Sequence, residues 1–198
     1  SITSGGSGTV TVVGTGGSVW GNNNHGVTLS GSGGVQSGAT GSIDITGTAG
    51  AGVDSSGIQA LSGTFGASNS TNVTLTTDRV GLAGTTVIQG TNTLVIEPKT
   101  ASTDIGIGSG SGDLQITAIG LGFIQDGFNG GITIGATNGT GDVDVNASTF
   151  LDPITVIGGT ISVTELSAGA NSVTLTATTG NITDGETSAG LTDVTGSS

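Results

Sequence analysis

Two aspartates, Asp142 and Asp144, stand two residues apart in the segment GDVDV. Side chains alternate between the two faces of an extended strand, so both carboxylates are expected on one outward face while Val143 and Val145 point inward. Paired carboxylates can perform acid–base chemistry on glycosidic bonds, and carboxylate oxygens also bind calcium. Two solvated carboxylates on an acidic surface explain the same pattern, and we favour that interpretation over a glycosidase.

The other acidic candidates for a calcium site are scattered. They are Asp126 in IQDGF, and Asp184 with Glu186 in NITDGET. An aspartate before glycine is more typical of a turn, in which the carboxylate accepts a hydrogen bond from nearby backbone. The calcium-binding nonapeptide repeat GGxGxD does not occur. We therefore assign no catalytic residue, no cofactor and no metal site, and Asp142 with Asp144 are the candidate ligands if calcium binds.

Basic side chains are too few to hold an anionic substrate. Arg79 and Lys99 are the two basic residues and are isolated in the sequence, whereas a lyase acting on acidic sugars needs such groups beside its carboxylates. His25, in GNNNHG, cannot form a metal site alone, and no cysteine is present to assist it. We expect a surface loop there, with the asparagine run 22–24 tolerating left-handed backbone. The net charge of −12 excludes nucleic acid as a partner.

The composition excludes several structural classes. The chain has 41 glycines, but they do not recur at every third position and only 2 prolines occur, so collagen is excluded. A mean hydropathy of +0.23 with 8% charged residues is too apolar for a disordered chain. The longest nearly apolar stretch, 118–124, is far shorter than the roughly 20 residues of a membrane-spanning helix. The first residues contain no methionine and no signal peptide, and we expect a piece of a longer protein.

Short apolar–polar–apolar units recur along the chain. GTVTVVGTGG at 8–17 returns as GSIDITGTAG at 41–50 and, more loosely, as TNVTLTTDRV at 71–80. GVTLSG at 26–31 is answered by GIQALSG at 57–63. This period-two alternation of β-branched residues, separated by glycine-rich turns, indicates short strands with one buried face. Strands this short can bury that face when successive repeats stack on one another.

We therefore predict an all-β fold, a right-handed parallel β-helix (β-solenoid). An immunoglobulin-like sandwich is the rival, which the scarcity of aromatic residues disfavours. Residues 1–90 are expected to form longer-period repeats, and residues 91–198 shorter-period rungs continuous with them. Outward positions are predicted at Thr11, Asp44, Thr74, Asp144 and Thr174. The predicted core comprises Val10, Val12, Ile43, Ile45, Val73, Leu75, Leu114, Ile116, Ile132, Ile134, Val143, Val145, Val173 and Leu175.

Most of the chain, roughly residues 1–185, resembles the repeats of very large bacterial surface proteins. The resemblance is carried by GTGGSVWGNNNHGVTLSGSGGVQSGATGSIDITGTAGAG and, more specifically, by the segment that runs from LVIEPKT through IQDGF to ITIGATNGTGDV. Similar runs occur in filamentous-haemagglutinin-like, β-strand-repeat proteins of cyanobacteria and other Gram-negative bacteria. The resemblance implies a right-handed parallel β-helix, secretion to the cell surface and a role in adhesion, aggregation or filament building. It implies no catalytic motif.

The expected function is that of a structural and adhesive protein at the bacterial cell surface, forming an extracellular rod or fibre without catalysis. Its expected partners are further copies stacked end to end, or the continuation of the same long chain, together with surface glycans. Neither nucleic acid nor a membrane span is expected. The alternative is a carbohydrate-active β-helix module that binds or cleaves polysaccharide through Asp142 and Asp144.

Overall fold

The protein is described by a computed structural model over residues 1–19, 21–38, 40–70, 72–186 and 193–196. In these ranges the chain is nearly all strand, and every strand pair is parallel. The prediction of an all-β fold is confirmed. Antiparallel pairing, which an immunoglobulin-like sandwich requires, is not found among the described strands.

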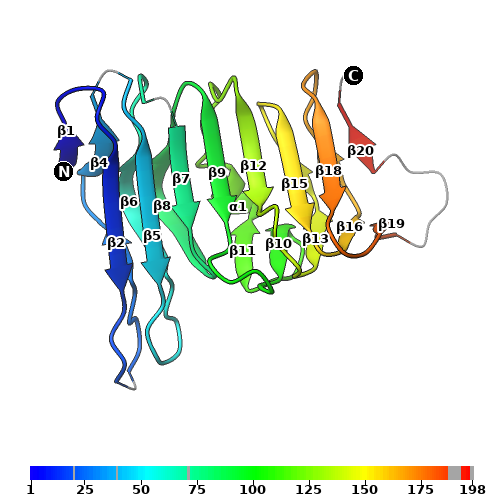
Figure 1. Ribbon diagram of the computed structural model, residues 1–198, viewed down its shortest axis with the longest axis horizontal. Helices are drawn as coiled ribbons and strands as arrows, with labels where there is room; N and C mark the ends of the chain where they lie inside the picture. Colours follow the sequence, from blue (N-terminus) through cyan, green and yellow to red (C-terminus); the bar gives the residue numbers. More distant parts are fainter. Residues whose placement is uncertain (20, 39, 71, 187–192, 197–198) are drawn as a thin grey trace.

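A long parallel sheet runs the length of the molecule, with the two termini near opposite ends of it (Figure 1). The chain returns to this sheet after each excursion through shorter strands, so sheet neighbours lie far apart in sequence. The register pairs Val10 with Ile43 and Ile43 with Val73, which are the 33- and 30-residue offsets of the sequence repeat. Within the described ranges the sheet consists of β2 (Val10–Thr15), β5 (Ile43–Thr48), β7 (Asn72–Thr76), β9 (Thr93–Glu97), β12 (Gly131–Gly135), β15 (Ile154–Gly158) and β18 (Val173–Ala177).

Shorter parallel sheets form from the strands that lie between successive visits to the long sheet. The first contains β1 (Ile2–Ser4), β3 (Val27–Leu29), β4 (Gly34–Ser37), β6 (Ile58–Phe65) and β8 (Val80–Ile88). The second contains β10 (Ile105–Gly108), β11 (Leu114–Thr117), β13 (Val143–Asn146), β16 (Ile161–Val163) and β19 (Ile182–Asp184). The third contains β14 (Ser148–Thr149), β17 (Leu166–Ser167) and β20 (Val194–Thr195).

The core forms where the apolar faces of these sheets meet. In β5, Ile43 and Ile45 have no exposed surface while Asp44 between them is half-buried, as the alternation predicts. Strand β7 repeats the pattern with buried Val73 and Leu75. The second repeated strip is also confirmed, because Val27 in GVTLSG pairs with Ile58 in GIQALSG.

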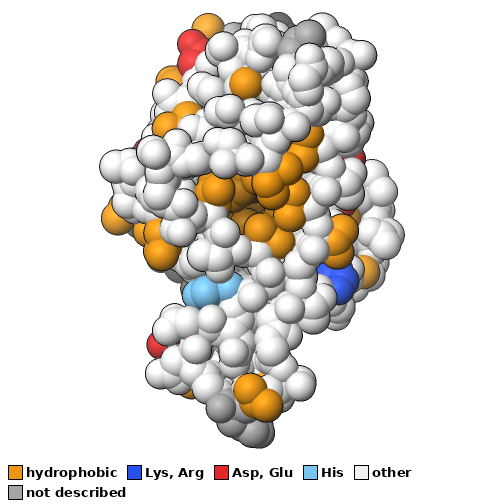
Figure 2. All heavy atoms as spheres, turned by 90° about the vertical axis from the view of Figure 1, so that its left-hand side faces the viewer, with side chains coloured by type: hydrophobic (Ala, Val, Ile, Leu, Met, Phe, Trp, Pro, Cys, Tyr) orange, Lys and Arg blue, Asp and Glu red, His pale blue; other side chains and the backbone are white. Residues whose placement is uncertain are grey.

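Three predicted core residues, Val12, Val173 and Leu175, are only half-buried, so their full burial is a wrong prediction. They lie on β2 and β18, the outermost strands of the long sheet in the described ranges, and each therefore has a neighbouring strand on one side only. At the β2 end the apolar side chains surround an open hollow (Figure 2). The other predicted core residues are buried, including Val10, which is itself on β2.

One helical turn, α1 (Ala118–Leu121), interrupts a chain in which no helix is predicted. It forms in the apolar stretch 118–124, where Thr117 caps it by accepting a hydrogen bond from the Gly120 N–H at 3.0 Å. Leu121 is buried under this turn, whereas Ile119 is 72% exposed. A single turn is too short to show the helical spacing of apolar residues on which prediction depends.

Backbones approach each other closely where β2 and β5 end. Gly14 and Gly47 are paired in the sheet, and a Cβ on Gly47 would collide with the carbonyl of Gly57. A Cβ on Gly14 would collide with Gly26 in the same way. Neither Gly14 nor Gly47 has a positive φ. Glycine is therefore needed at these positions because there is no room for a side chain, and not because the backbone is left-handed.

Candidate functional site

The two aspartates of the predicted pair make different contacts. Asp144 lies on β13, and its Oδ2 accepts a hydrogen bond from the Ser111 N–H at 2.8 Å. Asp142 immediately precedes the strand and is exposed, and its backbone N–H donates to Asp104 Oδ1 at 2.9 Å. The Asp144 carboxylate thus connects β13 to the loop at Ser111 in the neighbouring part of the fold. Neither aspartate lines the cavities and grooves described below.

Two further sequence candidates have local structural roles. Asp184 Oδ1 accepts a hydrogen bond from the Glu186 N–H at 2.7 Å, which is the turn geometry expected of aspartate before glycine. His25 is half-buried, and its Nδ1 accepts a hydrogen bond from the Ser56 N–H at 3.0 Å. Asn23, two residues before His25, has a φ of 63°, as predicted for the asparagine run. His25 therefore contacts the next repeat and is less exposed than a surface loop would make it.

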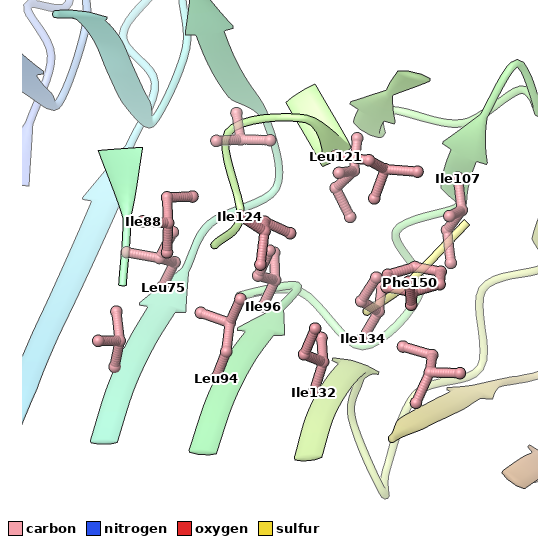
Figure 3. Packing of buried hydrophobic residues seen from close by; sticks show 14 of the residues in the cluster. Leu75, Ile88, Leu94, Ile96, Ile107, Leu121, Ile124, Ile132, Ile134 and Phe150 are labelled. Carbon is pink, nitrogen blue, oxygen red and sulfur yellow. The ribbon is translucent and has the colours of Figure 1, made fainter. Parts of the chain in front are cut away.

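A cavity of about 350 Å³ lies beneath α1, between the long sheet and the strands on its opposite side. The apolar side chains around this cavity include Leu121, Ile124, Ile132 and Phe150 (Figure 3). Its polar lining side chains are those of Thr149 and Asp152. A mostly apolar cavity with a carboxyl group at its wall is the usual form of a small binding site, and it makes Asp152 the residue of most interest.

Asp152 is 4% exposed, which is unusual for a charged side chain. Its Oδ1 accepts a hydrogen bond from the Gly127 N–H at 3.2 Å, whereas its Oδ2 is buried and has no hydrogen-bond partner. Burial raises the pKa of the Asp152 carboxyl above its ordinary value, and the neighbouring Asp126 carboxyl raises it further. Hydrogen bonds from the backbone N–H groups of Gly127 and Phe128 oppose this shift without cancelling it. The site thus holds two neighbouring carboxyl groups, one buried and one exposed.

The sequence names Asp126 but gives no reason to pair it with Asp152. The two residues are 26 positions apart and meet because β12 and β15 are neighbours in the long sheet, with Ile132 paired to Ile154. Each aspartate stands in the turn that leads into one of these strands, in IQDGF and LDPIT. Aligning the two strand sequences would have shown that both aspartates occupy the turn before a strand, and would have suggested that they are neighbours.

A polar groove of about 680 Å³ surrounds Arg79, elsewhere on the surface. Its lining includes Asp54 and Asp113 together with Gln59 and Gln115. Carboxylate, amide and guanidinium groups can hydrogen-bond the hydroxyl groups of sugars. Arg79 donates from Nη1 to the Ser55 carbonyl at 3.3 Å. The carboxylates that share the groove with Arg79 are those of Asp54 and Asp113, and not the predicted pair.

Asp78 is the most extensively hydrogen-bonded carboxylate in the described part of the chain. Its Oδ1 accepts from the Thr100 N–H at 2.7 Å and from Thr103 Oγ1 at 2.9 Å, and its Oδ2 accepts from Thr100 Oγ1 at 2.7 Å. Burial alone would raise the pKa of Asp78, but these hydrogen bonds outweigh it and lower the pKa below the ordinary value. The contacts join the end of β7 to the turn that follows β9.

Replacing Asp78 with alanine is expected to lower the free energy of unfolding by about 1–2 kcal/mol at pH 7, because charge-assisted hydrogen bonds are lost at a partly exposed site. A lowered carboxyl pKa contributes stability above the unfolded value of 3.8, and that contribution is lost as the pH falls below it. Urea unfolding at neutral and acidic pH measures both effects. The difference between wild type and variant should shrink in acid, whereas Asp142→Ala, at an exposed position, should change stability little at either pH.

The described residues contain no cluster of three or more histidine, aspartate or glutamate side chains arranged to hold a metal ion. Nor does any helix among them have the length and apolarity needed to cross a membrane.

Comparison of the chain with protein-family models, with curated proteins and with solved structures finds no match. The resemblance to filamentous-haemagglutinin-like proteins therefore stays a prediction.

Proposed function

We propose that the chain is a segment of a right-handed parallel β-helix that serves as a structural and adhesive rod at the bacterial cell surface. The observation that carries the proposal is the end of the molecule at β2, which has both an open strand edge and an open apolar hollow. The continuous parallel register along the long sheet agrees with a rod built by adding equivalent turns of chain. The resemblance to surface-protein repeats agrees with an extracellular location.

The edge of β2 is open to further pairing. Val10 and Gly16 direct their N–H groups to Ser42 and Thr48 in and beside β5. Since N–H groups alternate in direction along a strand, those of Thr11, Val13 and Thr15 point to the other side, where the described residues supply no partner strand. Unpaired edges of this kind recruit further strands.

The apolar hollow at the same end has a volume of about 230 Å³. Its apolar lining comes from several strands, and Ile2 at its margin is 52% exposed. A β2-like strand laid on this end would cover the hollow and pair with the open edge at once. We propose that such a strand comes from another copy stacked end to end, or from more of the same chain in a longer protein. Head-to-tail contacts of this kind generate filaments because they do not close.

The carbohydrate-active alternative receives no comparable support from the predicted pair, because Asp144 Oδ2 accepts a hydrogen bond from the Ser111 N–H and neither aspartate lines the cavity beneath α1 or the groove around Arg79. Contacts with surface glycans fit the proposal better as weak binding along the side of the rod. The polar groove around Arg79 has suitable groups for such contacts.

Val13→Pro is expected to weaken end-to-end association strongly while leaving the fold intact. Val13 is 71% exposed, and its N–H points away from β5, so proline removes a donor of the open edge without removing a bond inside the sheet. Sedimentation velocity should detect concentration-dependent species heavier than 18.7 kDa for wild type and at least about tenfold weaker association for the variant.

Val13→Thr is the matched control, because threonine keeps both the β-branched shape and the N–H. It should associate as wild type does. A wild-type protein that stays at 18.7 kDa at every concentration, or a proline variant that associates normally, would contradict assembly through this edge.

A further inference from the structure

The buried oxygen of Asp152 is the one polar feature of the cavity region that the rod does not explain. Asp152 Oδ2 is shielded from solvent and has no hydrogen-bond partner in the described structure. Its neighbour Asp126 is exposed, and a hydrogen bond between the two carboxyl groups requires one of them to be protonated, so Asp126 offers no donor when both are ionised. A buried carboxylate oxygen without a donor or a counter-charge is costly, so a positively charged partner would stabilise this arrangement.

The protein's own basic groups do not supply that partner. Lys99 Nζ donates to Thr48 Oγ1, and Arg79 Nη1 donates to the Ser55 carbonyl. These are the two lysine and arginine residues of a chain whose net charge is −12. A cation for Asp126 and Asp152 must therefore come from the solvent, and exposed Asp126 provides the route of entry.

We propose that Asp126 and Asp152 together bind a hard divalent cation of the calcium class. Both protein groups offer carboxylate oxygens, which calcium prefers, and backbone carbonyls and water can complete its shell of about six to eight oxygens. The cation would accept electron density from Asp152 Oδ2 while Asp152 Oδ1 keeps its hydrogen bond from Gly127. Two carboxylates and solvent correspond to the weak end of calcium affinities, with Kd about 10⁻⁴ to 10⁻³ M, as in extracellular modules.

The cation would connect the turns that precede two neighbouring strands of the long sheet, β12 and β15. Asp126 lies in the turn before β12, and Asp152 lies in the turn before β15. In the present arrangement these two turns are joined through the Gly127–Asp152 hydrogen bond, which at 3.2 Å is long for an N–H donor. Binding replaces repulsion between the two carboxylates with a shared ligand, so the folded state gains stability that rises with the logarithm of the free cation concentration once this exceeds Kd.

The test is thermal unfolding of the full chain at fixed pH and ionic strength, without and with about 10 mM CaCl₂, together with calorimetric titration of calcium into the folded protein. At the expected affinity the Tm of wild type should rise by about 3–10 °C. Asp126→Asn and Asp152→Asn should each abolish most of that rise and the calorimetric signal. Asp152→Asn should also be at least as stable as wild type without calcium, because its amide removes the repulsion and can donate to Asp126.

Asp142→Asn and Asp144→Asn are the matched controls, because they remove charge from the aspartates that the sequence nominates for calcium. Both should keep the full calcium response. The proposal is overturned if calcium does not raise the wild-type Tm, if the rise survives in Asp126→Asn and Asp152→Asn, or if it is lost only in the two controls. If Asp152→Asn fails to fold, Asp126→Asn at its exposed position decides the question alone.

Discussion

Replacing Gly47 with alanine is expected to destabilise the protein by about 3 kcal/mol or more, although the change adds a single methyl group. The new Cβ would occupy the position of the Gly57 carbonyl and also press on the Ile58 side chain. Both neighbours are held in place, Gly57 by backbone bonding between repeats and Ile58 by complete burial. Overpacking against a backbone that cannot move costs more than overpacking against a flexible side chain.

Equilibrium urea unfolding followed by far-ultraviolet circular dichroism measures the Gly47 effect. Gly6→Ala is the control, because a Cβ at Gly6 meets no described atom within 4 Å. That variant should change stability by less than about 1 kcal/mol and can stabilise by restricting the unfolded chain. Equal effects of the two substitutions would show that the close approach at Gly47 carries no energetic weight.

Truncating Ile45 to alanine is expected to lower the free energy of unfolding by about 2–5 kcal/mol. Ile45 has no exposed surface and lies between Val12 of β2 and Leu75 of β7 in the register of the long sheet. The cavity left behind cannot be filled by movement of β5 alone, because β5 is bonded to β2 on one side and to β7 on the other. Thermal and urea unfolding of the variant measure the loss.

Val13→Ala is the matched control for the Ile45 substitution, since Val13 pairs with Thr46 at the adjacent outward position and is largely exposed. It should cost less than about 1 kcal/mol, which is the span of strand preferences. If Val13→Ala costs as much as Ile45→Ala, the division into buried and outward faces is wrong.

Alternation of apolar residues was sufficient to predict the strands and most of the core. Ile43, Ile45, Val73 and Leu75 are buried at the positions that the repeat indicates, and their strands pair with the offsets that the repeat sets. The pattern describes the faces of a strand but not whether a further strand covers its edge. Val12 on β2 is therefore predicted correctly in direction and wrongly in extent of burial.

Glycine shows a second limit of prediction from sequence. Dense glycine suggests tight turns with positive φ, and Gly135 at the end of β12, with a φ of 105°, is such a position. Gly14 and Gly47 look the same in the sequence, yet glycine is needed there because two backbones touch. The contacts are with Gly26 and Gly57, which lie 12 and 10 positions away, just before β3 and β6 of a different sheet. The pairing of Asp126 with Asp152 was missed for the same reason, since the register between β12 and β15 is a property of the assembled fold.

The direction of the hydrogen bonds in the long sheet has a mechanical consequence. The strands lie across the long axis of the molecule, so the bonds between neighbouring strands run along it, from the end that carries the N-terminus to the end that carries the C-terminus (Figure 1). A pull between the termini therefore loads these bonds in tension, one strand pair at a time, instead of shearing many pairs together. Under load the molecule would yield in small steps from its ends, lengthening gradually while its central strands stay paired.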